Sequence, residues 1–107
     1  MTHTPLDLSI VIVNYNGWSL LAPCLESIQR TAGSLHCEIW VVDNGSTDGS
    51  VTNLRRHFST VSCMQNRENL GFARANNQAI PKCTGRHILL LNNDTLLLDG
   101  ALQTLVR

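Results

Sequence analysis

The 107-residue sequence has no excess charge of either sign, because eight Lys and Arg residues balance eight Asp and Glu residues. A general nucleic-acid surface needs clustered basic residues, so this balance argues against a nucleic-acid partner. No apolar run is long enough to span a membrane, and no basic segment leads into the apolar core of a secretory signal. A chain of this length is expected to form one domain, over 1–107, with one modest core.

Two kinds of motif are also missing. The four cysteines, Cys24, Cys37, Cys63 and Cys83, contain no CxxC pair, and the four histidines share no metal-binding spacing. We therefore expect reduced, mostly buried thiols in a cytoplasmic protein. Neither GxGxxG nor GxxxxGK[ST] occurs, which argues against hydride-transfer and kinase chemistry.

What is present is a regular alternation of apolar patterns. Short runs rich in β-branched and other apolar residues predict strands at 8–13, 37–42, 61–64 and 86–91. Apolar residues at helical spacing predict helices at 20–28, 51–58 and 72–80, and the start of another at 99–107. The order βαβαβαβ with short connections predicts a Rossmann-like α/β fold, a parallel sheet with helices on both faces.

Three local features carry finer expectations. Pro23 is expected in the first turn of its helix, where a missing N–H costs nothing. Asp99 is expected to be the N-cap of the last helix. The continuous apolar run 88–91 is typical of a strand buried on both faces.

Each predicted strand ends in a polar cluster, at 14–16, 43–48, 66–69 and 92–94. The carboxyl ends of parallel strands meet at one edge of a sheet, which is where open α/β sheets bind ligands. Asn, Asp and Gly also make good turns, and this alternative accounts for one or two of the clusters. It accounts less well for 92–94, which is apolar on both sides, so we favour a ligand site.

The chemistry of these clusters points to a phosphorylated ligand. Without a Gly-rich loop, a divalent cation is the simplest way to neutralise phosphate. Mg²⁺ and Mn²⁺ often need only one or two protein carboxylates beside phosphate oxygens and water. Asp94, with Asn92 nearby, fits that requirement, and Asp43 can accept a hydrogen bond from a base N–H.

Four segments together resemble the nucleotide-binding half of inverting family 2 glycosyltransferases of the GT-A fold. They are 9–16, 41–50, 69–77 and 90–95 (SIVIVNYN, VVDNGSTDGS, NLGFARANN and LLNNDT). The branch most resembled includes rhamnosyltransferase-like enzymes of cell-surface polysaccharide synthesis. The resemblance implies transfer of a sugar from a UDP- or dTDP-sugar to a hydroxyl of a saccharide or lipid-linked acceptor, with inversion.

The resemblance also implies roles for twelve residues. Nine would hold the nucleoside: Asn14, Tyr15 and Asn16 in the base pocket, Asp43, Ser46 and Asp48 at the uracil or thymine ring and in its loop, and Arg67, Asn69 and Gly71 beside base and ribose. Asn92, Asn93 and Asp94 take the place of the DxD motif, with Asp94 as the ligand of Mg²⁺ or Mn²⁺. Asn92 replaces the first carboxylate, so metal binding is expected to depend more on the donor diphosphate.

The family continues for another hundred residues or more, with the acceptor site and a carboxylate general base. We therefore expect a donor-binding part that is inactive alone, truncated before the acceptor half, and membrane-peripheral in the full-length enzyme. Leu96–Leu98, Leu102 and Leu105 are candidates for an exposed apolar surface that promotes self-association.

Two alternatives stay open. A non-catalytic nucleotide- or partner-binding module would also lack the base. A flavodoxin-like receiver domain is less favoured, because it needs an acidic pocket at the end of the first strand, where 14–16 stands.

Overall fold

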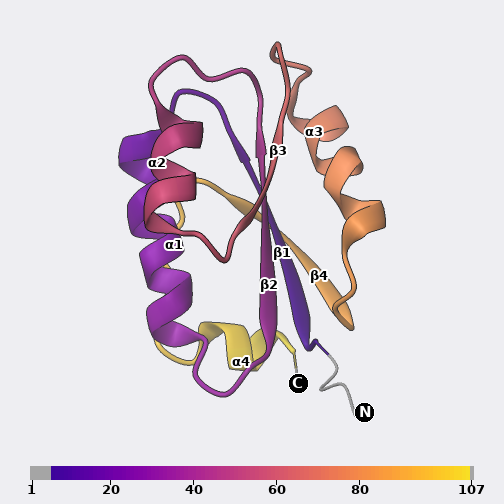
Figure 1. The fold of residues 1–107 in the computed structure, drawn as a ribbon. Helices are drawn as coiled ribbons and strands as arrows, with labels where there is room; N and C mark the ends of the chain where they lie inside the picture. The colour runs from indigo at the N-terminus through magenta and orange to yellow at the C-terminus, as the bar shows by residue number, and fades with distance from the viewer. Residues whose placement is uncertain (1–5, 107) are drawn as a thin grey trace.

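Four parallel strands form the sheet in the computed structural model, which describes residues 6–106. The strands are β1 (Leu8–Asn14), β2 (Cys37–Asp43), β3 (Ser62–Gln65) and β4 (His87–Asn92), in the order β3-β2-β1-β4. The helices are α1 (Trp18–Thr31), α2 (Ser50–His57), α3 (Phe72–Ala79) and α4 (Ala101–Leu105), with a 3₁₀ turn, η1, at Ile80–Lys82 (Figure 1). The predicted α/β fold class is confirmed.

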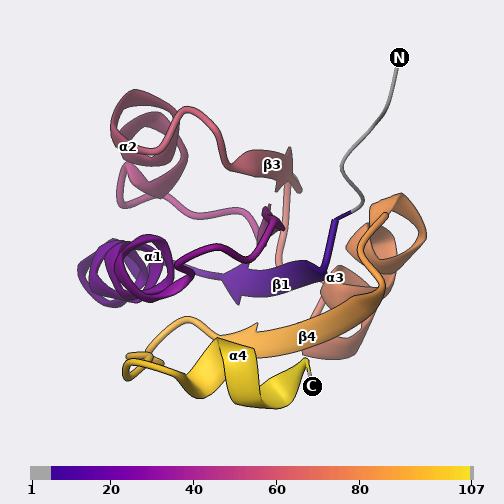
Figure 2. The ribbon, with the colours of Figure 1, turned by 90° about the horizontal axis from the view of Figure 1, so that it is seen from below.

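The helices cover both faces of the sheet, as Figure 2 shows, with α1 and α2 on one side and α3 on the other. Ile10 and Ile12 of β1 point into the larger core, where Leu25 of α1 and Leu102 of α4 complete the packing. On the opposite face, Val11 and Val42 pack against alanines of α3. Among residues 6–106, no helix combines the length and apolarity needed to cross a membrane.

The prediction that β4 is buried on both faces is wrong. β4 lies at the edge of the sheet, and Ile88 and Leu90 are 45% and 46% exposed. Leu89 and Leu91 contact the larger core, so one face of the strand is packed. The other face is open because α3 packs on β1 and β2.

Two helix starts also differ from the predictions. α1 begins at Trp18, so Pro23 lies inside the helix rather than in its first turn. The Ser19 carbonyl loses its helical donor, but Ser19 and Pro23 are exposed, so water can serve that oxygen. Asp99 is not the N-cap of α4, because Gly100 takes that place in the left-handed region at φ 84°.

Only part of the predicted apolar surface is exposed. Leu97 and Leu102 belong to the core, which corrects their expected exposure, whereas Leu96, Leu98 and Leu105 are exposed. Self-association through the exposed leucines stays a prediction that light scattering over a concentration series would test.

The prediction that the cysteines are mostly buried is wrong for three of the four. Cys24 is fully buried, and the other three cysteines are half-buried.

A polar network around Glu38 attaches the start of β4 to the sheet. Glu38 Oε2 accepts hydrogen bonds from Ser9 Oγ and from the Thr84 N–H, the latter at 2.6 Å. Ser9 Oγ in turn accepts the Gly85 N–H at 2.8 Å. Burial raises the pKa of Glu38, but the hydrogen bonds from Ser9, Thr84 and Trp40 outweigh it and leave that pKa below its ordinary value.

Acid is therefore expected to weaken this attachment. A carboxylate whose pKa is lower in the folded state than in the unfolded chain stabilises the fold above its unfolded pKa of about 4.3, and this contribution disappears as the pH falls through the folded pKa. Glu38→Gln should lower the free energy of unfolding at pH 7 and flatten its dependence on pH below about 4.3. Urea unfolding between pH 3 and 7 measures both effects, with the exposed Glu26→Gln as the control. Parallel curves for wild type and Glu38→Gln would contradict the prediction.

Candidate functional site

The carboxyl ends of the strands lie level with one another. Asn14 at the end of β1 is in register with Asp43 at the end of β2, and Asp43 is in register with Gln65 of β3. Val13 is in register with Asn92 at the end of β4. The four polar clusters therefore share one edge of the sheet, as predicted. We call residues 14–17, 43–48, 65–71 and 92–95 the strand-end rim.

Asn14 occupies the centre of the rim and is completely buried. Its Nδ2 donates to Asp43 Oδ1 at 3.1 Å, and its Oδ1 accepts from Asn93 Nδ2 at 3.1 Å. One amide thus connects the loop after β2 with the turn after β4. Its predicted place in the wall of a base pocket stays a prediction.

Asp43 is 1% exposed and hydrogen-bonded through both oxygens. Oδ1 accepts from Ser46 Oγ at 2.7 Å as well as from Asn14, and Oδ2 accepts the Ser46 N–H at 2.8 Å. Oδ2 thus has capacity for a further donor. Because Asp43 is 1% exposed, a base N–H reaches Oδ2 only if the groups that cover it move, so this predicted contact stays a prediction.

Ser46 and Asn16 join the first two loops of the rim. Ser46 Oγ accepts the Asn16 N–H at 2.8 Å, and Asn16 Oδ1 accepts the Thr47 N–H at 2.7 Å. Asn16 has a positive φ of 49°, a conformation that asparagine tolerates better than most residues. The loops after β1 and β2 are therefore fixed to each other.

Asp48 orders the starts of two helices. Its Oδ2 accepts the Trp18 N–H of α1 at 3.2 Å, and its Oδ1 accepts the Ser50 N–H of α2 at 2.9 Å. Partial burial raises the pKa of Asp48, but the hydrogen bonds from Ser50 and Trp18 outweigh it and hold that pKa below its ordinary value. Asp48 therefore fixes the starts of α1 and α2, and its predicted part in the nucleotide-binding loop stays a prediction.

Asn44 attaches the loop between β3 and α3 to the loop after β2, although the sequence patterns assigned Asn44 no role. Asn44 Nδ2 donates to the Gly71 carbonyl at 3.2 Å, and Asn44 Oδ1 accepts from Asn66 Nδ2 at 3.0 Å. Asn69 Oδ1 accepts the Gly71 N–H at 2.8 Å, and Gly71 has a φ of 85°. Asn69 and Gly71 thus form the turn into α3, and Arg67 is exposed beside them.

The turn after β4 leaves two of its polar side chains in solvent. The Thr95 N–H donates to the Asn92 carbonyl at 3.1 Å, and this closes the turn. Asn92 and Asp94 are exposed, whereas Asn93 is half-buried. Further along, the Leu97 N–H donates to the buried Ser27 Oγ at 3.0 Å, which ties the segment after the turn to α1.

Cys24 of α1 lies beneath this turn. Its Sγ is 3.9 Å from the Asn92 carbonyl oxygen. Burial, with the nearby charge of Asp94, raises the pKa of Cys24 to about 11. The thiol is therefore neutral at physiological pH and is a packing residue.

A metal at the rim would need ligands beyond the His, Cys, Asp and Glu side chains of residues 6–106. Residues 6–106 contain no group of three or more His, Cys, Asp or Glu side chains able to hold a metal ion by themselves. Asp94 is an exposed carboxylate next to two amide side chains. Such a set fits Mg²⁺ or Mn²⁺, which keep phosphate and water oxygens as ligands.

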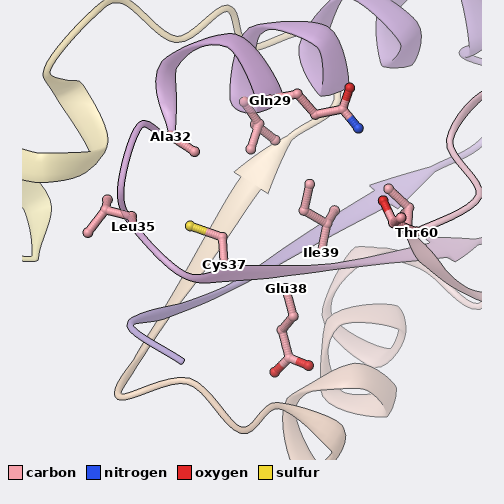
Figure 3. Close-up of a pocket in the computed structure, with 9 residues that line it drawn as sticks. Gln29, Ala32, Leu35, Cys37, Glu38, Ile39 and Thr60 are labelled. Atoms are coloured by element: carbon pink, nitrogen blue, oxygen red, sulfur yellow. The ribbon is translucent and has the colours of Figure 1, made fainter. Parts of the chain in front are cut away.

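A separate cavity of about 190 Å³ lies at the other end of the sheet, near the start of β2. Figure 3 shows Ala32, Leu35 and Ile39 around Cys37, with Glu38 directed to the opposite face. None of the predicted site residues lines it. The strand-end rim is therefore the better candidate, because it holds convergent polar groups.

Comparison with known proteins agrees with this geometry. The family model described as glycosyl transferase family 2 matches residues 9–107. The uncharacterized protein MT1568 of Mycobacterium tuberculosis (strain CDC 1551 / Oshkosh) is 35% identical over 104 residues, which cover 94% of this chain and 31% of that protein.

Two solved structures share the fold. The mannosyltransferase PcManGT from Pyrobaculum calidifontis, in complex with GDP-Man and Mn²⁺, is 27% identical, with a TM-score of 0.75 over 89% of this chain and 29% of its own. S. aureus TarS 1-349 in complex with UDP is 20% identical, with a TM-score of 0.82 over 94% of this chain and 31% of its own. The chain spans less than a third of each of these relatives. With the family match over 9–107, the chain belongs to glycosyl transferase family 2.

Proposed function

We propose that the strand-end rim binds the nucleoside diphosphate of a sugar donor, UDP- or dTDP-linked, and that Asp94 holds Mg²⁺ or Mn²⁺ there. The observation that carries this proposal is the exposure of Asp94 in a turn whose Asn93 hydrogen-bonds to Asn14, which in turn hydrogen-bonds to Asp43. The neighbours solved with UDP, and with GDP-Man and Mn²⁺, support a nucleotide and a divalent metal.

At the base end, the exposed ring of Tyr15 offers a stacking surface. Asp43 is the proposed acceptor for the N–H of uracil or thymine, once the groups that cover it move. Asn69 and Gly71 are proposed to border the ribose, with Arg67 beside them. At the other end, Asn92 is proposed to contact ribose or diphosphate.

The residues of this chain would bind and orient the donor for transfer with inversion to an acceptor hydroxyl. When bound, a divalent cation offsets the negative charge on the departing diphosphate. Deprotonation of the acceptor hydroxyl needs a general base. Asp99, at the start of α4, is the one described carboxylate after Asp94, and the cavity beside it is lined by Leu98 and Leu105 rather than by rim residues. We therefore propose that residues 1–107 alone bind donor without turnover. On the basis of the sequence resemblance alone, we also propose that the full enzyme is rhamnosyltransferase-like. Family membership favours the transferase over a non-catalytic module.

Calorimetric titration with UDP and dTDP, each with and without Mn²⁺ or Mg²⁺, tests the proposal, with adenosine diphosphate as the control nucleotide. We expect UDP or dTDP to bind more tightly when the metal is present, because Asp94 would hold the cation and the cation would offset the negative charge of the phosphates. Equal affinity in the presence of EDTA, or equal affinity for adenosine diphosphate, would contradict it.

A further inference from the structure

The hydrogen bonds of Asn14 have a fixed polarity. Asp43 is a carboxylate and accepts hydrogen bonds only, so Asn14 must turn its Nδ2 toward Asp43 Oδ1. The carbonyl Oδ1 of Asn14 then faces the turn after β4, and Asn93 must present its own Nδ2 to it. The charge of Asp43 thus determines the orientation of the Asn93 amide through Asn14, which hydrogen-bonds to both residues.

Burial makes this polarity costly to change. Asn14 and Asp43 are 0% and 1% exposed, and a buried polar group that loses its partner costs about 1–3 kcal/mol. No hydrogen bond among the described residues involves Asn93 Oδ1, so the acceptor end of Asn93 is free, and Asp94 is the next residue in the chain.

Gly17 provides the space for the contact. A Cβ at Gly17 would lie 2.4 Å from Asn93 Nδ2 and 2.9 Å from Asn14 Oδ1, the two atoms that form the hydrogen bond. The glycine is buried and its φ is not in the left-handed region, so space explains it better than backbone conformation. The Asn14–Asn93 contact therefore depends on the space that the missing side chain of Gly17 leaves.

We propose that Asn14 is a positioning residue that couples the nucleoside end of the rim to its metal end by holding Asn93, and through it the turn that carries Asp94. The inference rests on the proposed donor site and adds a role for a residue that need not touch the donor. Loss of Asn14 frees Asn93, and the turn with Asp94 is then less well placed to share a cation with a diphosphate.

The test measures the ratio of UDP affinity with Mg²⁺ to UDP affinity with EDTA in Asn14→Ala, Asn93→Ala and the double variant. A hydrogen bond contributes about 0.5–1.5 kcal/mol, so each single variant should lower this ratio about three- to tenfold. The double variant should lower it no further, because both substitutions remove one contact. Asn53→Ala, a half-buried amide on α2, is the control and should leave the ratio unchanged.

The outcomes separate the inference from the proposed function. If wild type shows no metal-dependent binding, the proposed function and the coupling both fail. If wild type shows it and the ratio is unchanged in Asn93→Ala, the coupling alone is overturned. Additive effects in the double variant would also overturn it. A purely structural role for Asn14 would lower the unfolding midpoint without changing the ratio. Should Asn14→Ala not fold, Asn93→Ala and Gly17→Ala test the same contact from its other side, because Asn93 is half-buried and can move.

Discussion

Replacing Gly85 by alanine is expected to lower the free energy of unfolding by about 3 kcal/mol or more. A Cβ at this position would lie 2.5 Å from the Ser9 backbone nitrogen and 2.6 Å from the Leu8 carbonyl carbon. Both atoms belong to the central strand β1, which cannot rotate away as a side chain can. Any shift of residue 85 would also lengthen its 2.8 Å hydrogen bond to Ser9 Oγ and disturb the partners of Glu38. Domains of this size are stabilised by only about 5–15 kcal/mol, so the loss is large.

Urea unfolding of Gly85→Ala measures this loss, and Gly100→Ala provides the matched control. Gly100 has a φ of +84° but no atom within 4 Å of its would-be Cβ, so its substitution adds backbone strain without a clash. We expect that strain to cost about 1–2 kcal/mol. Gly85→Ala should therefore be the more destabilised of the two. The reverse order would mean that β1 and the segment before β4 can separate cheaply.

Much of the fold was predictable from apolar periodicity because the pattern is local. The predicted strand 37–42 and the observed β2 (Cys37–Asp43) differ by one residue. What periodicity cannot supply is a neighbour in space. The apolar run of β4 is the same whether a helix covers one face or both, and α3 happens to lie over β1 and β2. For the same reason, nothing in the sequence joins Glu38 to Thr84, which is 46 positions away.

The sequence predicted which edge of the sheet holds the site, but not which of its side chains are exposed. Parallel strands bring their ends together whatever the side chains are, so the shared rim followed from the alternation of elements. Which side chains would be exposed did not follow: Asp94 is in solvent, whereas Asn14 and Asp43 are buried. Asn44 and Gly17 were missed because their importance depends on contacts with Gly71 and Asn93. Asn44 lies inside the polar cluster 43–48 and Gly17 directly follows Asn16, and these placements are the signal that the sequence contains.

Replacing Asp94 by asparagine is expected to lower the metal-dependent affinity for UDP by about 100-fold or more. Mutation of a residue that hydrogen-bonds to a metal ligand typically lowers metal affinity about 10- to 100-fold, and loss of the ligand itself should matter at least as much. Asparagine keeps the size of the side chain but removes the only carboxylate of the turn at 92–95. Asp94 is exposed, so the free energy of unfolding should change by less than about 0.5 kcal/mol. Calorimetry with Mg²⁺ or EDTA measures the binding, and urea unfolding measures the stability.

The control is Asp99→Asn, which removes the same charge from an exposed position five residues later. If long-range attraction between protein charge and cation explained the effect, both variants would lose affinity, and the loss would shrink as salt screens it. If Asp94 coordinates the cation, only Asp94→Asn loses affinity, and it behaves like wild type in EDTA. Full metal-dependent affinity in Asp94→Asn would show that the cation is held elsewhere. The rim would then retain its nucleoside end, around Asp43 and Tyr15, as the part of the proposal still standing.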